Sequence, residues 1–215
     1  MSNSFIKHNN RIRNWRSYDS QILVATRTGP LDSLRNQNVL VIADAQNLML
    51  GARDLGFRLS WKQLGVILDA AGLQVQKHVV YAARSLNERW ASYFAQRGWI
   101  PHQRMTRLVR TRFGLQRRAN TDHHIALISG ALLIRSKARV IVVASGDGDL
   151  VEDIVEASRM ASLTRRFVTL SLAGSTNLRL NAAVSSFISA NIEIGRDSLR
   201  RAFAAGSSAQ EEGAI

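Results

Sequence analysis

A chain of 215 residues can hold one domain with a sizeable core, and a hydrophobic content of 46% is too high for a disordered protein. The absence of cysteine excludes disulfides, zinc–thiolate sites and thiol nucleophiles, and it fits a reducing cytoplasm. The formal net charge of +13 favours a polyanionic partner, and we expect nucleic acid before an anionic membrane. A third explanation is that the charge serves solubility alone. Because no signal-peptide pattern or membrane-spanning apolar stretch is found, we expect a cytoplasmic protein without a membrane partner.

The first predicted unit is a basic N-terminal arm over residues 1–37. It has few acidic residues and no clear hydrophobic periodicity, and its basic residues include Lys7, Arg11, Arg13, Arg16 and Arg27. We expect the folded domain to cover residues 38–195. Residues 196–215 are expected to form the end of a helix and a flexible tail.

Short continuous apolar runs within the domain are typical of strands buried on both faces. They fall at Val39–Ala43, Val79–Tyr81, Val140–Ala144 and, more weakly, Phe167–Leu170. Helical patterns alternate with these runs. They begin at Ser60 with a capping box to Gln63, at Ser85 with Glu88, at Thr121, and near Asp149. Since strands and helices alternate, the sequence predicts an α/β fold with a mostly parallel sheet flanked by helices.

The helix predicted from Thr121 to about Ser136 is apolar on most of its faces. A helix of that kind is usually surrounded by other parts of a protein. We therefore expect it to be well buried.

Acidic residues follow two of the predicted strands. Asp44 comes directly after the first strand, and Asp147 and Asp149 follow the Val140–Ala144 strand in a glycine-containing turn. In an open parallel sheet, ligands bind at the carboxyl ends of the strands, and clustered carboxylates favour Mg²⁺ or Mn²⁺. Each of these residues could instead be no more than a helix N-cap.

Several segments resemble NYN domains, the LabA-like branch of the PIN-type nucleases. Val39–Asn47 is similar to their opening strand and D-x-x-N motif, and Val140–Leu150 to their strand followed by S-G-D-x-D. Thr121–Asp122 is similar to their K-G-x-D step, and Ser175–Ile188 to their closing segment and last helix. The resemblance covers about residues 38–192 and implies a Rossmann-like PIN fold that hydrolyses RNA phosphodiester bonds with Mg²⁺ or Mn²⁺.

Carried over by position, the resemblance implies a metal-binding acidic cluster of Asp44, Asp122, Asp147 and Asp149, with Asn47 assisting beside Asp44. The sequence also departs from the family. Many members carry a further acid where this chain has Ile128, and a usual aspartate is replaced around Val184 and Ser185. These departures keep a second hypothesis open: an RNA-binding or scaffold module of the same fold with weak or lost catalysis.

We expect no catalytic role for the histidines. Asp122-His123-His124 spells the motif of DHH phosphoesterases, but here it opens a helix instead of ending a strand, so we interpret it as a coincidence. His78 and His102 have no partner at metal-ligand spacing. We expect both to be ordinary surface or half-buried residues.

A strip without acidic residues runs from Arg89 to Thr121. Arginines in such a strip favour bidentate phosphate contacts, and we predict RNA contacts for Arg104, Arg107, Arg110, Arg112, Arg117 and Arg118. Trp99, in the same strip, is predicted to belong to the core. The expected partner is RNA in single-stranded or loop regions, a choice over DNA that rests on the resemblance. Homo-oligomerisation is left open.

Overall fold

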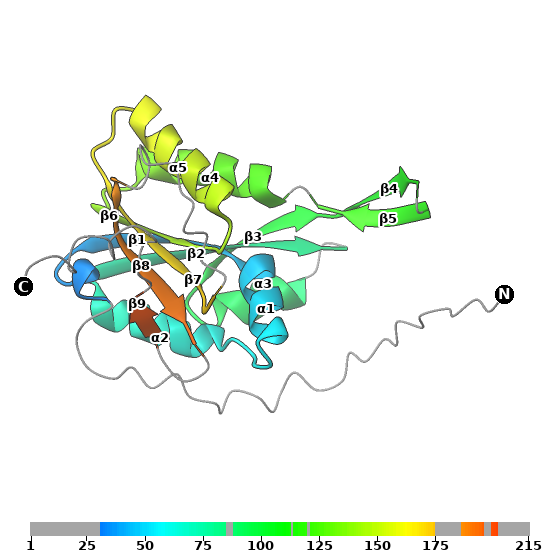
Figure 1. The fold of residues 1–215 in the computed structure, drawn as a ribbon, viewed down its shortest axis with the longest axis horizontal. Coiled ribbons are helices and arrows are strands. Elements are labelled where there is room, and N and C mark those ends of the chain that lie inside the picture. Colours follow the sequence, from blue (N-terminus) through cyan, green and yellow to red (C-terminus); the bar gives the residue numbers. More distant parts are fainter. Residues whose placement is uncertain are drawn as a thin grey trace, which may run out of the picture.

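The computed structural model describes residues 31–84, 88–112, 114–119, 121–174, 186–195 and 199–201. Residues 1–30 of the predicted arm and residues 202–215 of the predicted tail lie outside these ranges. The predicted α/β class is confirmed, because strands and helices alternate along the chain and build a sheet with helices on both faces (Figure 1).

The structure defines the following bounds. The strands are β1 (Asn38–Asp44), β2 (Gln74–Ala83), β3 (Ile100–Met105), β4 (Arg107–Thr111), β5 (Gly114–Arg118), β6 (Val140–Ala144), β7 (Arg166–Leu172), β8 (Ile188–Ile194) and β9 (Leu199–Arg201). The helices are η2 (Asp32–Leu34), α1 (Ala45–Asp54), α2 (Trp61–Ala71), α3 (Glu88–Ala95), α4 (Thr121–Arg135) and α5 (Gly148–Met160).

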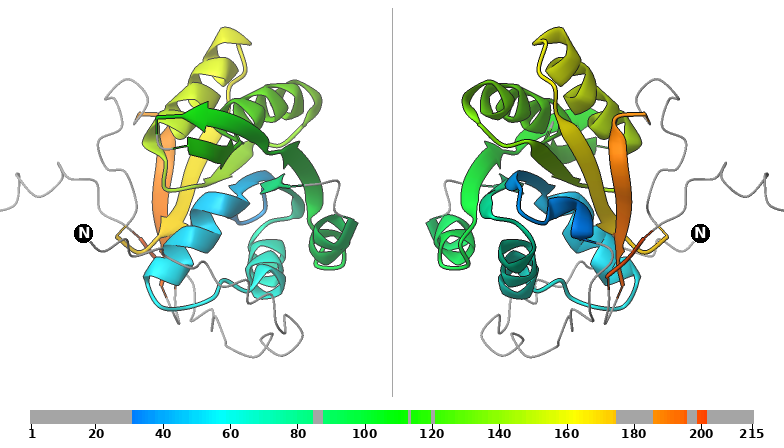
Figure 2. Two further views of the ribbon diagram at one scale, coloured as in Figure 1. Left: turned by 90° about the vertical axis from the view of Figure 1, so that its right-hand side faces the viewer. Right: turned by 90° about the vertical axis from the view of Figure 1, so that its left-hand side faces the viewer.

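The main sheet has seven strands in the order β3-β2-β1-β6-β7-β8-β9. All neighbours from β3 to β8 are parallel, and β9 is antiparallel to β8. One apolar layer packs the sheet against α1, α2 and α3, and a second packs it against α4 and α5, as both views in Figure 2 show. The two layers bury both faces of the central strands, as their continuous apolar runs predicted.

Strand register brings the site residues level with one another. Asp44 is the Cα partner of Val80 on β2, and Val80 is the Cα partner of His102 on β3. On the other side of β1, Ala43 pairs with Ala144, the last residue of β6. The residues that follow β1 and β6 therefore meet at the carboxyl edge of the sheet.

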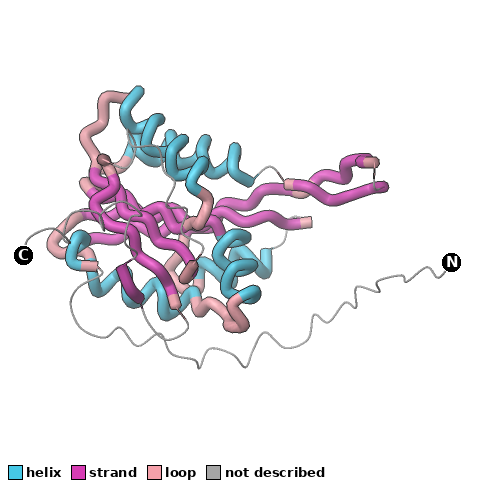
Figure 3. Tube along the Cα trace, in the orientation of Figure 1, coloured by secondary structure: helices cyan, strands magenta, loops and turns pink. Residues whose placement is uncertain are grey.

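A β-hairpin made of β4 and β5 continues from β3 and projects from the body of the domain (Figures 1 and 3). Its strands pair from Arg107↔Arg118 at the base to Thr111↔Gly114 at the turn. Gly114 has a φ of 99°, a left-handed conformation that favours glycine. The hairpin was not predicted, because its residues are mostly polar or exposed and carry no core pattern.

Four expectations need correction. α4 is not well buried, because Leu127 and Ile134 on its outer face are 73% and 71% exposed; the helix covers the sheet with one face only. Ile188 begins strand β8 where the closing helix was expected to end, and residues 199–201 form β9 where a helix end was expected. The core also reaches into the predicted arm, since Leu34 is fully buried.

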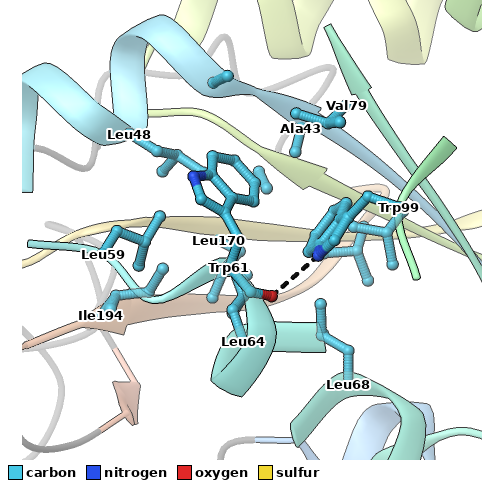
Figure 4. Packing of buried hydrophobic residues seen from close by; sticks show 14 of the residues in the cluster. Ala43, Leu48, Leu59, Trp61, Leu64, Leu68, Val79, Trp99, Leu170 and Ile194 are labelled. Atoms are coloured by element: carbon cyan, nitrogen blue, oxygen red, sulfur yellow. Dashed lines mark hydrogen bonds between the residues drawn. The ribbon is translucent and has the colours of Figure 1, made fainter. Parts of the chain in front are cut away.

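The layer beneath α2 and α3 is built around two tryptophans (Figure 4). Trp61 and Trp99 are both 1% exposed and meet edge to face with ring centroids 5.0 Å apart. The indole Nε1 of Trp99 donates a hydrogen bond to the Trp61 carbonyl at 2.9 Å, whereas the indole Nε1 of Trp61 has no partner among the described residues. The prediction that Trp99 belongs to the core is confirmed.

The two tryptophans provide a matched pair of substitutions. Trp99→Phe leaves the buried Trp61 carbonyl without its donor, whereas Trp61→Phe removes a buried donor that has no partner. Because both lose a similar volume, we expect Trp99→Phe to lower the free energy of unfolding by about 1–2 kcal/mol more than Trp61→Phe. Urea unfolding measures the difference, and equal losses would contradict the role of the hydrogen bond.

Candidate functional site

Asp44 ends β1 and at the same time caps α1. Its Oδ1 accepts hydrogen bonds from the backbone N–H groups of Gln46 and Asn47, at 2.9 and 3.0 Å. The side chain is 5% exposed, and its Oδ2 has no hydrogen-bond partner among the described residues. The N-cap role considered from the sequence is thus confirmed, and one carboxylate oxygen is left for another ligand.

Asn47 joins the two strand ends. Its Oδ1 accepts a hydrogen bond of 2.9 Å from the backbone N–H of Gly146, in the turn after β6. In the same turn the hydroxyl of buried Ser145 accepts one from the N–H of Asp147. Asn47 therefore positions the β6–α5 turn beside Asp44. Ser145 was not singled out from the sequence, although its place in the Ser-Gly-Asp motif was the available signal.

Asp147 and Asp149 sit at the start of α5 but differ in their surroundings. Asp147 is the N-cap, and its Oδ1 accepts the N–H of Asp149 at 3.0 Å. Asp149 lies in the first turn of the helix and is exposed. Both residues are therefore at the predicted edge of the sheet, with Asp149 turned more toward solvent.

The electrostatics of Asp44 identify its close neighbours. Burial raises the pKa of Asp44 from 3.8 to about 6, against the lowering effect of its backbone hydrogen bonds. The charges of Asp122, in the first turn of α4, and of Asp147 raise this pKa further. The structure thus brings Asp44, Asp122 and Asp147 together from three elements. It shows no such effect of Asp149 on Asp44.

The carboxylates offer hard oxygen ligands with a buried, partly unpaired member, which is the chemistry that Mg²⁺ and Mn²⁺ prefer. Within the part of the chain that the structure describes, no three His, Asp or Glu side chains are close enough to hold one ion together. The residues therefore fit an ion held through one or two carboxylates and several waters, the manner in which proteins usually bind Mg²⁺. Ile128, where many NYN proteins carry an acid, packs against the apolar layer beside the sheet.

Two histidines that were expected to be ordinary form a pair. His78 on β2 is 6% exposed, and its Nδ1 lies 2.9 Å from Nε2 of His102 on β3. The ring centroids are 5.2 Å apart and the ring planes differ by 20°. The centroid distance equals the N···N distance plus the two distances from ring centre to nitrogen, so the rings meet edge to edge and not face to face. An in-line contact of this length is a hydrogen bond and leaves no room for a metal between the nitrogens. Local sequence could not show it, because the contact depends on the register of β2 with β3.

This pair continues toward α4. Burial and the neighbouring His102 lower the pKa of His78 to about 4. Burial and His124 lower the pKa of His102, while burial and Arg104 lower that of His124. His123, the other histidine of the DHH-like triplet, is exposed, and the triplet opens a helix as expected.

The predicted phosphate-binding arginines divide between the sheet and the hairpin. Arg104 is half-buried on β3, whereas Arg107 and Arg110 are exposed on β4. Arg112 is exposed in the hairpin turn, and the backbone positions of Arg117 and Arg118 lie on β5. The arginines thus extend from the edge of the sheet onto the hairpin.

No family model and no curated protein matches this sequence. In three dimensions the chain is similar to the crystal structure of a protein of unknown function from Vibrio parahaemolyticus, with a TM-score of 0.55 and 12% sequence identity. The likeness covers 80% of this chain and 97% of that one. At this level of identity it shows a shared Rossmann-like α/β fold. Among the described residues, no helix is both long enough and apolar enough to cross a membrane.

The raised pKa of Asp44 makes a prediction about pH. The folded state holds the Asp44 proton more tightly than the unfolded state, so this residue's contribution to stability is present below pH 4 and lost as pH rises through about 6. The shift corresponds to about 3 kcal/mol. Asp44→Asn keeps the capping oxygen and should remove this loss. Urea unfolding in the presence of a chelator measures the free energy of unfolding between pH 4 and 8. We expect this free energy to fall with rising pH more steeply for the wild type than for the variant. Parallel pH profiles would contradict the raised pKa of Asp44.

Proposed function

We propose that this chain is a metal-dependent endoribonuclease that hydrolyses RNA phosphodiester bonds at the carboxyl edge of its sheet. The observation that carries the proposal is the meeting of Asp44, Asp122 and Asp147 from three separate elements around a buried carboxylate. A buried carboxylate that two further carboxylates repel is unfavourable unless a cation offsets the repulsion. The NYN resemblance supports the choice of RNA as the substrate.

Asp44 and Asp147 would hold the ion, with Asp122 reaching it through water and exposed Asp149 in an outer position. A bound Mg²⁺ or Mn²⁺ would activate a water and offset charge on the attacked phosphate. The protein would hold the carboxylates in position before the substrate binds. The hydrogen bond from Gly146 to Asn47 does this by tying the end of β6 to the start of α1.

The arginines would hold the RNA strand. Arg107 and Arg110 stand exposed on a hairpin that projects from the domain, so they can approach a phosphate backbone without displacing the core. Arginine suits this task because its planar guanidinium contacts two phosphate oxygens at once. The net charge of +13 adds a general attraction for RNA.

The alternative is an RNA-binding module of the same fold that has lost efficient catalysis. It is favoured by Ile128, which places an apolar contact where many NYN proteins have an acid. In that case RNA binding through the arginines would persist without turnover.

The first test of the enzyme concerns its carboxylates. We expect Asp44→Asn and Asp147→Asn to reduce Mn²⁺-dependent RNA cleavage at least about a hundredfold while RNA affinity is kept or rises, because the lost charge acts mainly on the transition state. Mn²⁺ should also raise the melting temperature of the wild type but not of these variants.

Asp153→Asn is the matched control, since this carboxylate is exposed on α5 one turn beyond Asp149 and should change neither cleavage nor the melting shift. Wild-type protein that binds several RNAs tightly and cleaves none with Mg²⁺ or Mn²⁺ would favour the binding module.

The hairpin makes a separate prediction about binding. Replacing Arg107 and Arg110 together by Ala should weaken RNA affinity across sequences and flatten its dependence on salt by about one unit of slope per lost phosphate contact. Arg53→Ala with Arg159→Ala removes the same charge from α1 and α5, where both arginines are exposed and paired with neighbouring acids. If both double variants lower the slope equally, attraction is general and the hairpin has no special role.

A further inference from the structure

Four basic side chains on β2, β3 and the first turn of α4 take no part in the proposed ion site. They are His78 on β2, His102 and Arg104 on β3, and His124 on α4, and we refer to them as the basic cluster. We propose that the basic cluster is a phosphate-binding site, in which Arg104, His102 and His124 contact the oxyanion and His78 positions His102.

The elements bring these residues to one place. His102 and Arg104 are alternate residues of β3 and therefore project from the same face of the sheet. This is the face covered by α4, because Val80, the partner of His102, packs in the apolar layer of α4 and α5. The edge position of β3 leaves His102 and Arg104 half-buried, so a ligand can still reach them.

The first turn of α4 separates the basic cluster from the carboxylates. Residues two apart on an α-helix point in directions about 200° apart. Asp122 and His124 therefore leave α4 on nearly opposite sides. Accordingly, Asp122 acts on Asp44 of β1, whereas His124 feels the charge of Arg104 on β3. The carboxylates and the basic cluster therefore lie on the two sides of one helix turn, as a phosphate bound beside a cation requires.

The basic cluster lacks a counter-charge. The side chain of Arg104 makes no ion pair or hydrogen bond with any residue that the structure describes, although the residue is half-buried. On the same face of the sheet, Arg104 lies two residues beyond His102, whose ring contacts His78. A half-buried cation surrounded by basic groups is stabilised by a bound anion, and a guanidinium matches the geometry of a phosphate.

The histidine pair suits an anion better than a metal. Because Nδ1 of His78 and Nε2 of His102 point at each other, the other ring nitrogen of His102, Nδ1, is the one available for a ligand. When His78 donates in this pair, the proton of neutral His102 resides on Nδ1, which can then donate to an oxyanion. His78 would thus act through the tautomer of His102.

In RNA such a phosphate is either a backbone diester or a terminal monoester, and both present the same oxyanion. The role of the site in hydrolysis, holding a phosphate next to the carboxylates, rests on the proposed function. Phosphate binding itself does not, because it requires neither a metal nor turnover.

The experiment uses the full chain in a chelator, so that no metal contributes. Inorganic phosphate represents the terminal group and dimethyl phosphate the backbone diester. Each is titrated at constant ionic strength while the ring resonances of His78 and His102 are followed by NMR. We expect saturable shifts, and binding at least about tenfold weaker for Arg104→Gln. Arg53→Gln removes an equal charge from the exposed surface of α1 and should bind as the wild type does.

Saturation by both probes identifies a backbone site, and saturation by inorganic phosphate alone identifies a site for a terminal phosphate. Absence of saturable shifts with either probe, or equal binding by Arg104→Gln and the wild type, overturns the proposal. The role of His78 is tested through the tautomer of His102, which the chemical shifts of the His102 ring nitrogens report. His78→Leu should change these shifts and weaken phosphate binding. His78→Gln, which can still donate a hydrogen bond, should restore both the shifts and the binding. RNA cleavage without phosphate binding would overturn this site while leaving the proposed function intact.

Discussion

The parallel pairing of β1 with β2 on one side and β6 on the other is the constraint on which the site depends. It ends β1 and β6 at the same level, and it places Asp44 in one row with Val80 and His102. The register is held by burial, because alternate residues of β1 pack into the two opposite apolar layers. A shift of one residue would turn Asp44 to the other face of the sheet, away from Asp122 on α4.

Asp44 carries two opposing physical effects. Its two backbone hydrogen bonds stabilise the start of α1, while burial and two neighbouring carboxylates oppose its charge. A helix cap alone would be satisfied by a neutral asparagine or serine, which avoids the second effect. The retained charge is therefore a local loss of stability that a cation would offset, and such losses are typical of functional sites.

The sequence allowed prediction of the buried parts of this arrangement and failed at its edges. β6 is fully buried and β1 is buried beyond Asn38, so their apolar runs and the aspartates at or after their ends could be recognised locally. β3 lies at the edge of the sheet, and its residues Ile100–Met105 mix polar and apolar types without a core pattern. The contact of His78 with His102 joins residues on neighbouring strands, and only the register of those strands reveals it. On α4, the apolar side chains of Leu127 and Ile134 looked like core residues, but composition cannot tell which face of a helix meets the sheet.

Basic groups close to the acidic edge would also reduce the repulsion between the carboxylates and an anionic substrate. Under the proposed function, RNA would bring negative charge to an edge that already carries Asp44, Asp122 and Asp147, so an acidic edge alone would repel the substrate. The basic cluster on β2, β3 and α4 and the arginines on the adjoining hairpin would offset this repulsion without neutralising the carboxylates, because Asp122 and His124 leave α4 on nearly opposite sides. Salt screens the exposed hairpin charges far more than the half-buried Arg104. The proposed attraction of the chain for RNA should therefore weaken with salt sooner than the proposed binding of a phosphate at the edge of the sheet.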